Sequence, residues 1–275
     1  MKVAIISDIH ANLEALTAVT ENIHAQNISS IYALGDIVGY GIDPYNCIAY
    51  LKQHNISSVQ GNHDYMAATN KYPSTISSMA KNSLEWTHKS LSKKSKQRLL
   101  NLPLVHKVTD QLVLTHASLY EPEKWHYLNG DDEKTIHNHF TGQMSSLCCV
   151  GHTHIPKIIK KNSQNQRIHN LTQESNKLEL NQQYIINPGS VGFSRDLDYR
   201  ASYATIELDD KYAQVNFHRI DYDRSTTLKK LKKNNTLEQD MVNIMKQTKM
   251  ANDYPRRSPR YQPIAPNIAG SSQIE

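Results

Sequence analysis

The chain has 275 residues, of which 38% are hydrophobic and 21% charged, and its formal net charge is +5. This length and composition fit one large α/β domain or two small ones with a buried core, and they exclude a chain that is disordered throughout. No apolar run approaches the ~20 residues needed to cross a bilayer, so the sequence predicts no membrane partner.

The excess positive charge belongs to the C-terminal part of the chain. Residues 1–224 carry 22 basic and 22 acidic side chains, whereas residues 225–275 carry 9 basic and 4 acidic ones. A neutral body does not favour a nucleic-acid partner. The first residues have too short an apolar run for a secretory signal, and the three cysteines form no disulfide framework or zinc pattern. We therefore expect a cytoplasmic protein.

Short apolar runs alternate with helical periodicity through the first 120 residues. We expect strand, helix, strand, helix, strand, helix and helix at residues 2–7, 12–26, 31–34, 43–53, 56–60, 77–91 and 92–100. Strands and helices alternating at this spacing indicate right-handed crossovers and a largely parallel sheet.

After Pro103 the pattern changes to strands with short connections. Strands are predicted at residues 105–108, 112–115, 147–150, 157–160, 184–187, 203–208 and 214–219. A run of strands after strand–helix–strand units indicates a second sheet. The polar stretch 162–181, rich in Asn and Gln, is expected to be a long hairpin or a mobile loop.

Composition also divides the chain along its length. We expect a main domain over residues 1–222, a helical extension over 223–249, and a basic, proline-containing, disordered tail over 250–275.

Polar clusters follow five of the predicted strands. They are Ser7-Asp8-Ile9-His10, Gly35-Asp36, Gly61-Asn62-His63-Asp64, Thr115-His116 and Gly151-His152-Thr153-His154. The carboxyl ends of parallel strands share one edge of a sheet, where ligands bind. On extended backbone, residues i and i+2 point to the same side, so Asp8 should act with His10, and His152 with His154.

The residue types in these clusters indicate a metal centre. Two carboxylates, one amide and several imidazoles, without a thiolate, suit Mn²⁺, Fe, Zn²⁺ or Ni²⁺. Seven such ligands are too many for one metal with an open position, but they suit two metals that share a carboxylate. Taken alone, each cluster could equally be a turn, a hairpin connection or a hydrogen-bonded core histidine. The argument rests on all five occurring together at strand ends.

Together the five clusters resemble the metal signature of the calcineurin-like metallophosphoesterases. The segments G-D-I-V-G-Y-G at 35–41 and N-P-G-S-V-G at 187–192 resemble the bacterial and archaeal phosphodiesterase-type branch of that family. The resemblance covers about residues 1–222. It implies an α/β fold, namely a four-layer α-β-β-α sandwich of two mixed sheets flanked by helices.

The resemblance also implies roles for the site residues. Asp36 would bridge two divalent metal ions, Mn, Fe, Zn or Ni, and His63 would be the catalytic group that contacts phosphate and assists the leaving oxygen. The other ligands would be Asp8, His10 and His154 for the first ion, and Asn62, His116 and His152 for the second. The implied reaction is hydrolysis of a phosphodiester or phosphomonoester by a metal-bridging hydroxide, on a small phosphate ester or a nucleotide.

One departure concerns the group that holds phosphate. The Ser/Thr protein phosphatase branch has an Asp and then an Arg shortly after the bridging Asp, and this chain has Gly39 and Tyr40 at those two positions, which disfavours a protein phosphatase. Arg195 and Arg200 are candidates to replace that cation, although each could instead form a surface ion pair with a neighbouring Asp. Tyr40 is a further candidate for substrate binding.

Two other functions remain open. A diadenosine-tetraphosphate-type nucleotide pyrophosphatase would share every metal ligand. A non-catalytic binding scaffold of the same fold belongs to a different class, and such scaffolds tend to lose metal ligands or the histidine equivalent to His63. Because this chain keeps all of them, the sequence favours an enzyme.

Overall fold

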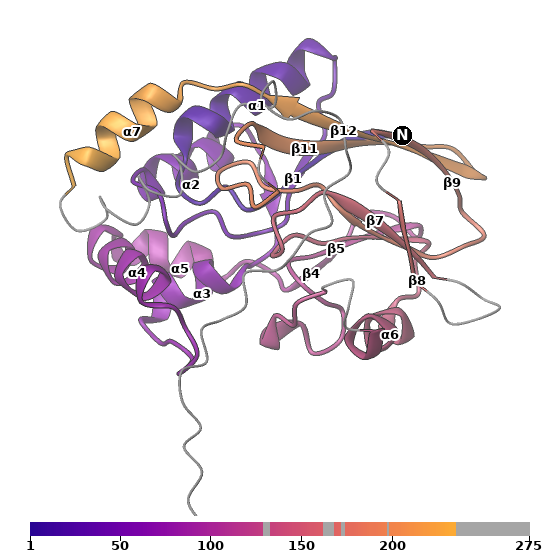
Figure 1. Ribbon diagram of the computed structural model, residues 1–275, viewed down its shortest axis with the longest axis horizontal. Helices are drawn as coiled ribbons and strands as arrows, with labels where there is room; N and C mark the ends of the chain where they lie inside the picture. The colour runs from indigo at the N-terminus through magenta and orange to yellow at the C-terminus, as the bar shows by residue number, and fades with distance from the viewer. Residues whose placement is uncertain (129–132, 162–167, 172–173, 197, 235–275) are drawn as a thin grey trace, which may run out of the picture.

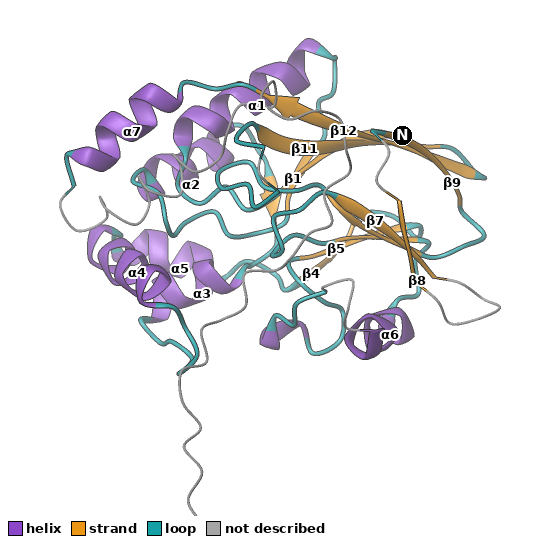
Figure 2. Ribbon diagram, in the orientation of Figure 1, coloured by secondary structure: helices purple, strands orange, loops and turns teal. Residues whose placement is uncertain are grey.

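The computed structural model describes residues 1–128, 133–161, 168–171, 174–196 and 198–234. Two six-stranded mixed sheets pack against each other, and helices cover their outer faces (Figure 1 and Figure 2). The expected four-layer α/β sandwich is therefore confirmed.

The first sheet begins with the predicted strand–helix–strand units. Its strands, in spatial order, are β3 (Ser57–Ser58), β2 (Ile31–Ala33), β1 (Lys2–Ile6), β11 (Ala201–Leu208), β12 (Tyr212–Ile220) and β9 (Ser175–Glu179). Strands β1, β2 and β3 are parallel, and the other three add antiparallel pairings. The connections are helices α1 (Leu13–Ala25) and α2 (Pro44–Gln53). Asn12 caps α1 by accepting a hydrogen bond from the Ala15 amide, and Pro44 begins α2.

The second sheet contains the predicted later strands. In spatial order they are β4 (Val105–Lys107), β5 (Leu112–Thr115), β6 (Leu147–Cys149), β10 (Tyr184–Asn187), β7 (Lys157–Lys161) and β8 (Ile168–Leu171). Strands β5, β6 and β10 are parallel, so their carboxyl ends point the same way.

The stretch 162–181 connects the two sheets. Strand β8 pairs with β7 as a hairpin, as expected, but β9 leaves that sheet and pairs with β12 of the first sheet. Residues 162–167 and 172–173 lie outside the described residues.

The remaining helices lie on the flanks. They are α3 (Asn62–Thr69), α4 (Ser78–Ser90), α5 (Lys93–Leu100), the short 3₁₀ helix η1 (Pro122–Lys124), α6 (Glu133–Gly142) and α7 (Arg224–Lys232). Neither α3 nor α6 is predicted by the sequence analysis. The expected strand at 56–60 shrinks to two residues, because Gln60 turns away to donate a hydrogen bond to the Pro103 carbonyl and α3 starts directly afterwards.

Alternating side chains of β1 build the two hydrophobic layers on either side of the first sheet. Val3 and Ile5 pack with residues of the second sheet, whereas Ala4 and Ile6 pack toward the helices. A third apolar layer lies between the second sheet and α6, where Phe140 packs with strand residues. Figure 1 shows α6 on the outer side of this sheet and α1 on the outer side of the other.

The C-terminal region is described only in part. Helix α7 lies within the predicted extension at 223–249, while residues 235–275, including the expected tail, lie outside the described residues. Among the helices in the described ranges, none combines the length and apolarity needed to cross a membrane.

Candidate metal centre

The five polar clusters meet between the two sheets. Three follow β1, β2 and β3 of the first sheet, and two follow β5 and β6 of the second. Contacts cross from one sheet to the other: Asp8 lies 3.2 Å from His154, and Asn62 lies 3.1 Å from His116. The prediction that strand ends share a site is therefore right, but the edge belongs to two sheets and not to one.

Left-handed backbone turns, and not extended segments, orient most of these side chains. The ligand candidates Asp8, His10, Asp36, His152 and His154 all have positive φ, between 48° and 64°. The expected reason for pairing residues i and i+2 is therefore wrong, although the pairs do meet. Non-glycine residues in this conformation cost about 1–3 kcal/mol each and cluster at functional sites.

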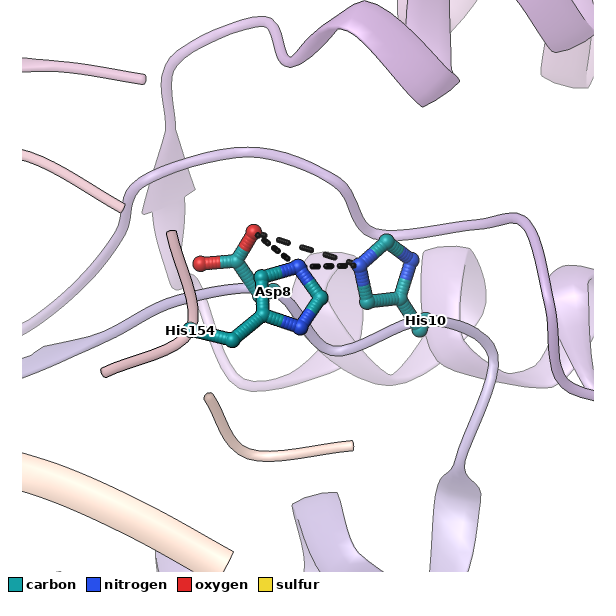
Figure 3. Close-up of side chains that lie close together, drawn as sticks. All are labelled: Asp8, His10 and His154. Atoms are coloured by element: carbon teal, nitrogen blue, oxygen red, sulfur yellow. Dashed lines mark hydrogen bonds and ion pairs between the residues drawn. The ribbon is translucent and has the colours of Figure 1, made fainter. Parts of the chain in front are cut away.

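Asp8, His10 and His154 form the first group of candidate ligands (Figure 3). Their side chains point toward one another, with Nε2 of His10 3.1 Å from Nε2 of His154 and 3.9 Å from Oδ1 of Asp8. All three are buried. Asp8 is held in place because its carboxylate accepts hydrogen bonds from the Ser7 hydroxyl and the His152 amide.

Asp36, His116 and His152 form the second group, with Asn62 beside it. Nε2 of His116 lies 3.4 Å from Oδ2 of Asp36 and 3.1 Å from Oδ1 of Asn62. The ring of His152 stands edge-on to that of His116, with centroids 5.0 Å apart. The same Asp36 oxygen lies 3.7 Å from Nε2 of His10, so this carboxylate lies between the two groups.

The imidazole tautomers fit a metal. Nδ1 of His10, His116 and His154 lies 3.2, 2.6 and 2.5 Å from a backbone carbonyl oxygen. A carbonyl only accepts hydrogen bonds, so Nδ1 carries a proton in all three rings, and in the neutral rings of His10 and His154 Nε2 presents a lone pair to the centre. Two such lone pairs, on His10 and His154, face each other at 3.1 Å. A metal ion or a proton shared by these nitrogens would relieve the repulsion of the two lone pairs, and a histidine oriented by a backbone carbonyl is the usual geometry of a metal ligand.

Burial and mutual charge shift the pKa values of these groups. Burial lowers the pKa of His10, His152 and His154. Burial alone would raise the pKa of Asp8 and Asp36, but the neighbouring histidines outweigh it and hold both well below their usual range.

His116 is the exception among the histidines. Burial opposes its charge, but Asp36 outweighs the burial and raises the pKa of His116 to about 9. The metal-free centre therefore holds one imidazolium beside two carboxylates.

His63 lies at the same centre, at the start of α3. Its ring centroid is 4.9 Å from that of His10, and its backbone amide donates a hydrogen bond of 2.8 Å to Asp36. Its buried Nδ1 has no hydrogen-bond partner among the described residues. Gly39, with φ of 88°, is needed there because a Cβ would stand 2.3 Å from that nitrogen. Burial lowers the pKa of His63 to about 4.

Asp64 is a structural part of the centre to which the sequence analysis gives no role. Its buried carboxylate accepts hydrogen bonds from the amides of Gly61, Ile37 and Val38, which ties the loop after β2 to the start of α3. Burial and the nearby Asp36 raise the pKa of Asp64 to about 7. An acidic residue three positions after Gly61 is a typical helix-start signal, and it could have revealed α3.

The two candidate arginines have different neighbours. Arg200 forms a surface ion pair with Asp198 at 2.6 Å. Burial opposes the charge of Arg195, but Tyr40, Tyr127 and Asp8 raise its pKa, so its charge lies near these groups. Tyr40 is buried, and its ring stacks on Phe193 and meets the ring of His10 edge-on. Burial raises the pKa of Tyr40 to about 12.

The model of the calcineurin-like phosphoesterase superfamily domain matches residues 1–211. A protein of Methanocaldococcus jannaschii, itself described as uncharacterized, is 35% identical over 237 residues, which are 84% of this chain and 92% of that protein.

Two solved structures resemble this chain in fold. A metallophosphoesterase from Sphaerobacter thermophilus has 34% identity and a TM-score of 0.76, over 90% of this chain and 99% of its own. A hypothetical protein from Pyrococcus horikoshii has the same fold at 19% identity and a TM-score of 0.70, over 91% of this chain and 99% of its own.

Proposed function

The chain belongs to the calcineurin-like phosphoesterase superfamily, and from that premise we propose that it hydrolyses phosphate esters with two divalent metal ions. The observation that supports this most is the position of Asp36. One of its oxygens lies 3.7 Å from Nε2 of His10 and 3.4 Å from Nε2 of His116, between two buried groups of ligand type. A shared carboxylate is what a two-metal centre needs.

We assign the ligands as the sequence predicts. Asp36 would serve both ions; Asp8, His10 and His154 would complete the first, and Asn62, His116 and His152 the second. When bound, Mn²⁺, Fe, Zn²⁺ or Ni²⁺ ions at this centre supply an activated water and neutralise charge on the phosphate oxygens.

His63 is proposed to assist the leaving oxygen. It lies beside Asp36 without being needed as a ligand, and its backbone amide donates a hydrogen bond to that carboxylate. Burial keeps its imidazole neutral at neutral pH, and an anionic phosphate next to it would favour the protonated form. A proton held there can pass to the departing oxygen.

Arg195 is proposed to bind the phosphate, and Tyr40, which acts on Arg195, is proposed as a second substrate-binding residue. Arg195 is among the groups that lower the pKa of His63, His152 and His154, which supports a position of its positive charge near the centre. A guanidinium there supplies the cation that the segment at 35–41 lacks. Because a diester gains binding energy from its second substituent, we propose diesters as the better substrates and monoesters as the poorer ones.

We also propose the cytoplasm as the location and residues 1–222 as the main domain. The three cysteines, Cys47, Cys148 and Cys149, are free and buried, which suits a reducing compartment.

A metal and substrate screen tests the proposed function. The metal-free protein is loaded with each of the four metals and assayed with p-nitrophenyl phosphate, bis-p-nitrophenyl phosphate and diadenosine tetraphosphate. Hydrolysis of the two nitrophenyl esters, lost in Asp36→Asn, supports a phosphoesterase. Cleavage of the dinucleotide alone would favour the nucleotide pyrophosphatase. Metal binding without any hydrolysis would favour the non-catalytic scaffold.

A further inference from the structure

Tyr127 stands over one of the metal-ligand candidates at the edge of the centre. Its ring stacks on His152, with centroids 3.8 Å apart and planes 26° from parallel. His152 is buried, whereas 46% of the Tyr127 side chain is exposed. One face of the phenol ring is therefore covered by the imidazole, and the other is open to solvent beside the centre.

A positive charge lies next to this open aromatic ring. Tyr127 and Tyr40 both contribute to the raised pKa of Arg195, so the guanidinium lies close to both phenol groups. The same charge acts on His152, on which Tyr127 stacks. An aromatic face and a guanidinium side by side at a phosphate site complement an anion that carries a flat substituent.

The segment that carries Tyr127 is held in a defined position. Glu121 and Trp125 both have a φ of 47°, on either side of the short helix η1. The Trp125 ring packs on Tyr65 of α3 with centroids 5.5 Å apart. His126 lies 3.2 Å from the Glu121 carboxylate. These contacts tie the turn that carries Tyr127 to α3 and to Glu121, and a ring that is positioned before binding lowers the entropy cost of stacking a ligand on it.

We propose that Tyr127 is a specificity residue that stacks the second, non-leaving substituent of the phosphate ester where this is a planar aromatic group, an aryl group or a nucleobase, while Arg195 binds the phosphate. This inference rests on the proposed function and narrows its substrate class. Stacking accepts any flat ring, because every aromatic group has a π face. Substrates with an aliphatic second substituent would lose this contact.

Three diesters with the same p-nitrophenolate leaving group and the same charge test the proposal. Their second substituents are methyl, phenyl and thymidine 5′-yl. We expect kcat/KM to be about tenfold higher for the phenyl and thymidine esters than for the methyl ester. The Tyr127→Ala variant should bring these ratios close to one, whereas Tyr127→Phe should keep them.

Tyr120→Ala is the matched control. Tyr120 belongs to the same segment, is 41% exposed and stacks on His126, not on a ligand candidate. It should leave the ratios of the wild type in place. If Tyr127→Ala lowers all three esters by the same factor, the ring only orients His152, and the proposal is wrong. A raised ratio for phenyl alone or thymidine alone identifies which aromatic class the ring selects.

A binding measurement separates failure of the inference from failure of the proposed function. Calorimetric titration of the metal-loaded protein with phenylphosphonate and with methylphosphonate needs no turnover. Tighter binding of phenylphosphonate by about tenfold, lost in Tyr127→Ala, supports the stacking role even if no ester is hydrolysed. Equal affinities in the wild type would overturn it, whatever the activity.

Discussion

Asp36 and His63 are in direct contact, but their proposed roles differ. We therefore expect their substitutions to have different effects. Asp36→Asn removes the shared carboxylate, so we expect loss of bound metal and of activity together. His63→Ala should keep both metal ions and lower kcat by roughly 10²–10⁴-fold, the usual scale for general acid–base assistance. Metal content by elemental analysis, beside the rate, checks the pair. Equal metal loss in both variants would make His63 a ligand, which its place near His10 and Asp36 also permits.

His116 makes metal binding depend on pH in an unusual range. The ordinary pKa of histidine, 6.5, would make affinity fall below neutral pH, but Asp36 raises that of His116 to about 9. A metal ion must displace this proton, so affinity should rise with pH up to about 9, and binding at pH 7.5 should release close to one proton. Calorimetry in two buffers of different ionisation enthalpy measures the release. Affinity that is flat from pH 7 to 9 would contradict it.

Arg195 provides the test of the phosphate-binding role. We expect kcat/KM with Mn²⁺ to be higher for bis-p-nitrophenyl phosphate than for p-nitrophenyl phosphate, and Arg195→Ala to lower both. Arg200→Ala is the control, because Arg200 is paired with Asp198. A monoester turned over far faster than the diester, with Arg195→Ala without effect, would indicate a general phosphatase.

The sequence could predict site residues that belong to a short motif, but not residues whose position depends on contacts with distant parts of the chain. The seven ligand candidates each sit in a short motif after a strand, so their position at strand ends could be predicted, whereas the meeting of two sheets at one centre could not. Tyr127 has no such signal, because its position depends on the packing of a turn against His152, 25 residues further along. The left-handed backbone at Asp8 and Asp36 is likewise fixed by contacts between loops, such as the bond from the Asp8 amide to the Gly35 carbonyl.

Among the helices and strands, the predicted limits are right where the pattern of apolar residues is long and regular. Helix α1 and the buried strands β5 and β10 are close to their predicted limits. Helix α3 is missed because it presents polar ligand candidates at its first turn instead of an apolar stripe. Helix α6 is missed because its apolar contacts are few, and Ile136, His139 and Phe140 are its buried residues.

His139, a buried residue of α6, makes the stability of the fold depend on pH. Burial lowers its pKa to about 4, from 6.5, and its Nδ1 accepts a hydrogen bond from the Leu119 amide. The unfolded chain takes up a proton as pH falls through 6.5, whereas the folded protein does not until pH 4. Stability is therefore lost below pH 6.5, by about 2 kcal/mol between pH 7 and pH 5 from this group alone.

The variant His139→Asn keeps an acceptor for Leu119 and removes this titration. In urea unfolding with a chelator present, its free energy of unfolding should fall by about 2 kcal/mol less than that of the wild type over the same pH interval. Parallel pH profiles for the two proteins would mean that His139 is not held neutral in the fold.

At the scale of the whole molecule, the two sheets together set the spacing of the centre. The first ligand group combines Asp8 and His10 from the first sheet with His154 from the second. The apolar layer between the sheets, with Ile5 and Leu114 among its members, therefore fixes the separation of groups that belong to different parts of the chain.

The C-terminal helix α7 also supports the candidate metal centre, although it lies outside the region that matches the family model. That region ends at residue 211. Lys230 forms ion pairs with Glu14 and Asp43, which hold α7 against α1 and α2. Leu231 is buried in one cluster with Tyr40 and Phe193, the aromatic pair next to His10. The helix thus packs behind one wall of the candidate metal centre.

Leu231→Ala tests whether this contact reaches the site. Removing a buried leucine side chain costs about 2–5 kcal/mol, so the melting temperature should fall. Because Tyr40 and Phe193 lose a packing partner, we also expect kcat/KM for the diester to fall several-fold at a temperature where the variant is still folded, with metal content unchanged. Lys232→Ala, at an exposed position of the same helix, should change neither quantity. A lower melting temperature with unaltered kcat/KM would limit α7 to a stabilising role, since the wall would then hold its position without the helix behind it.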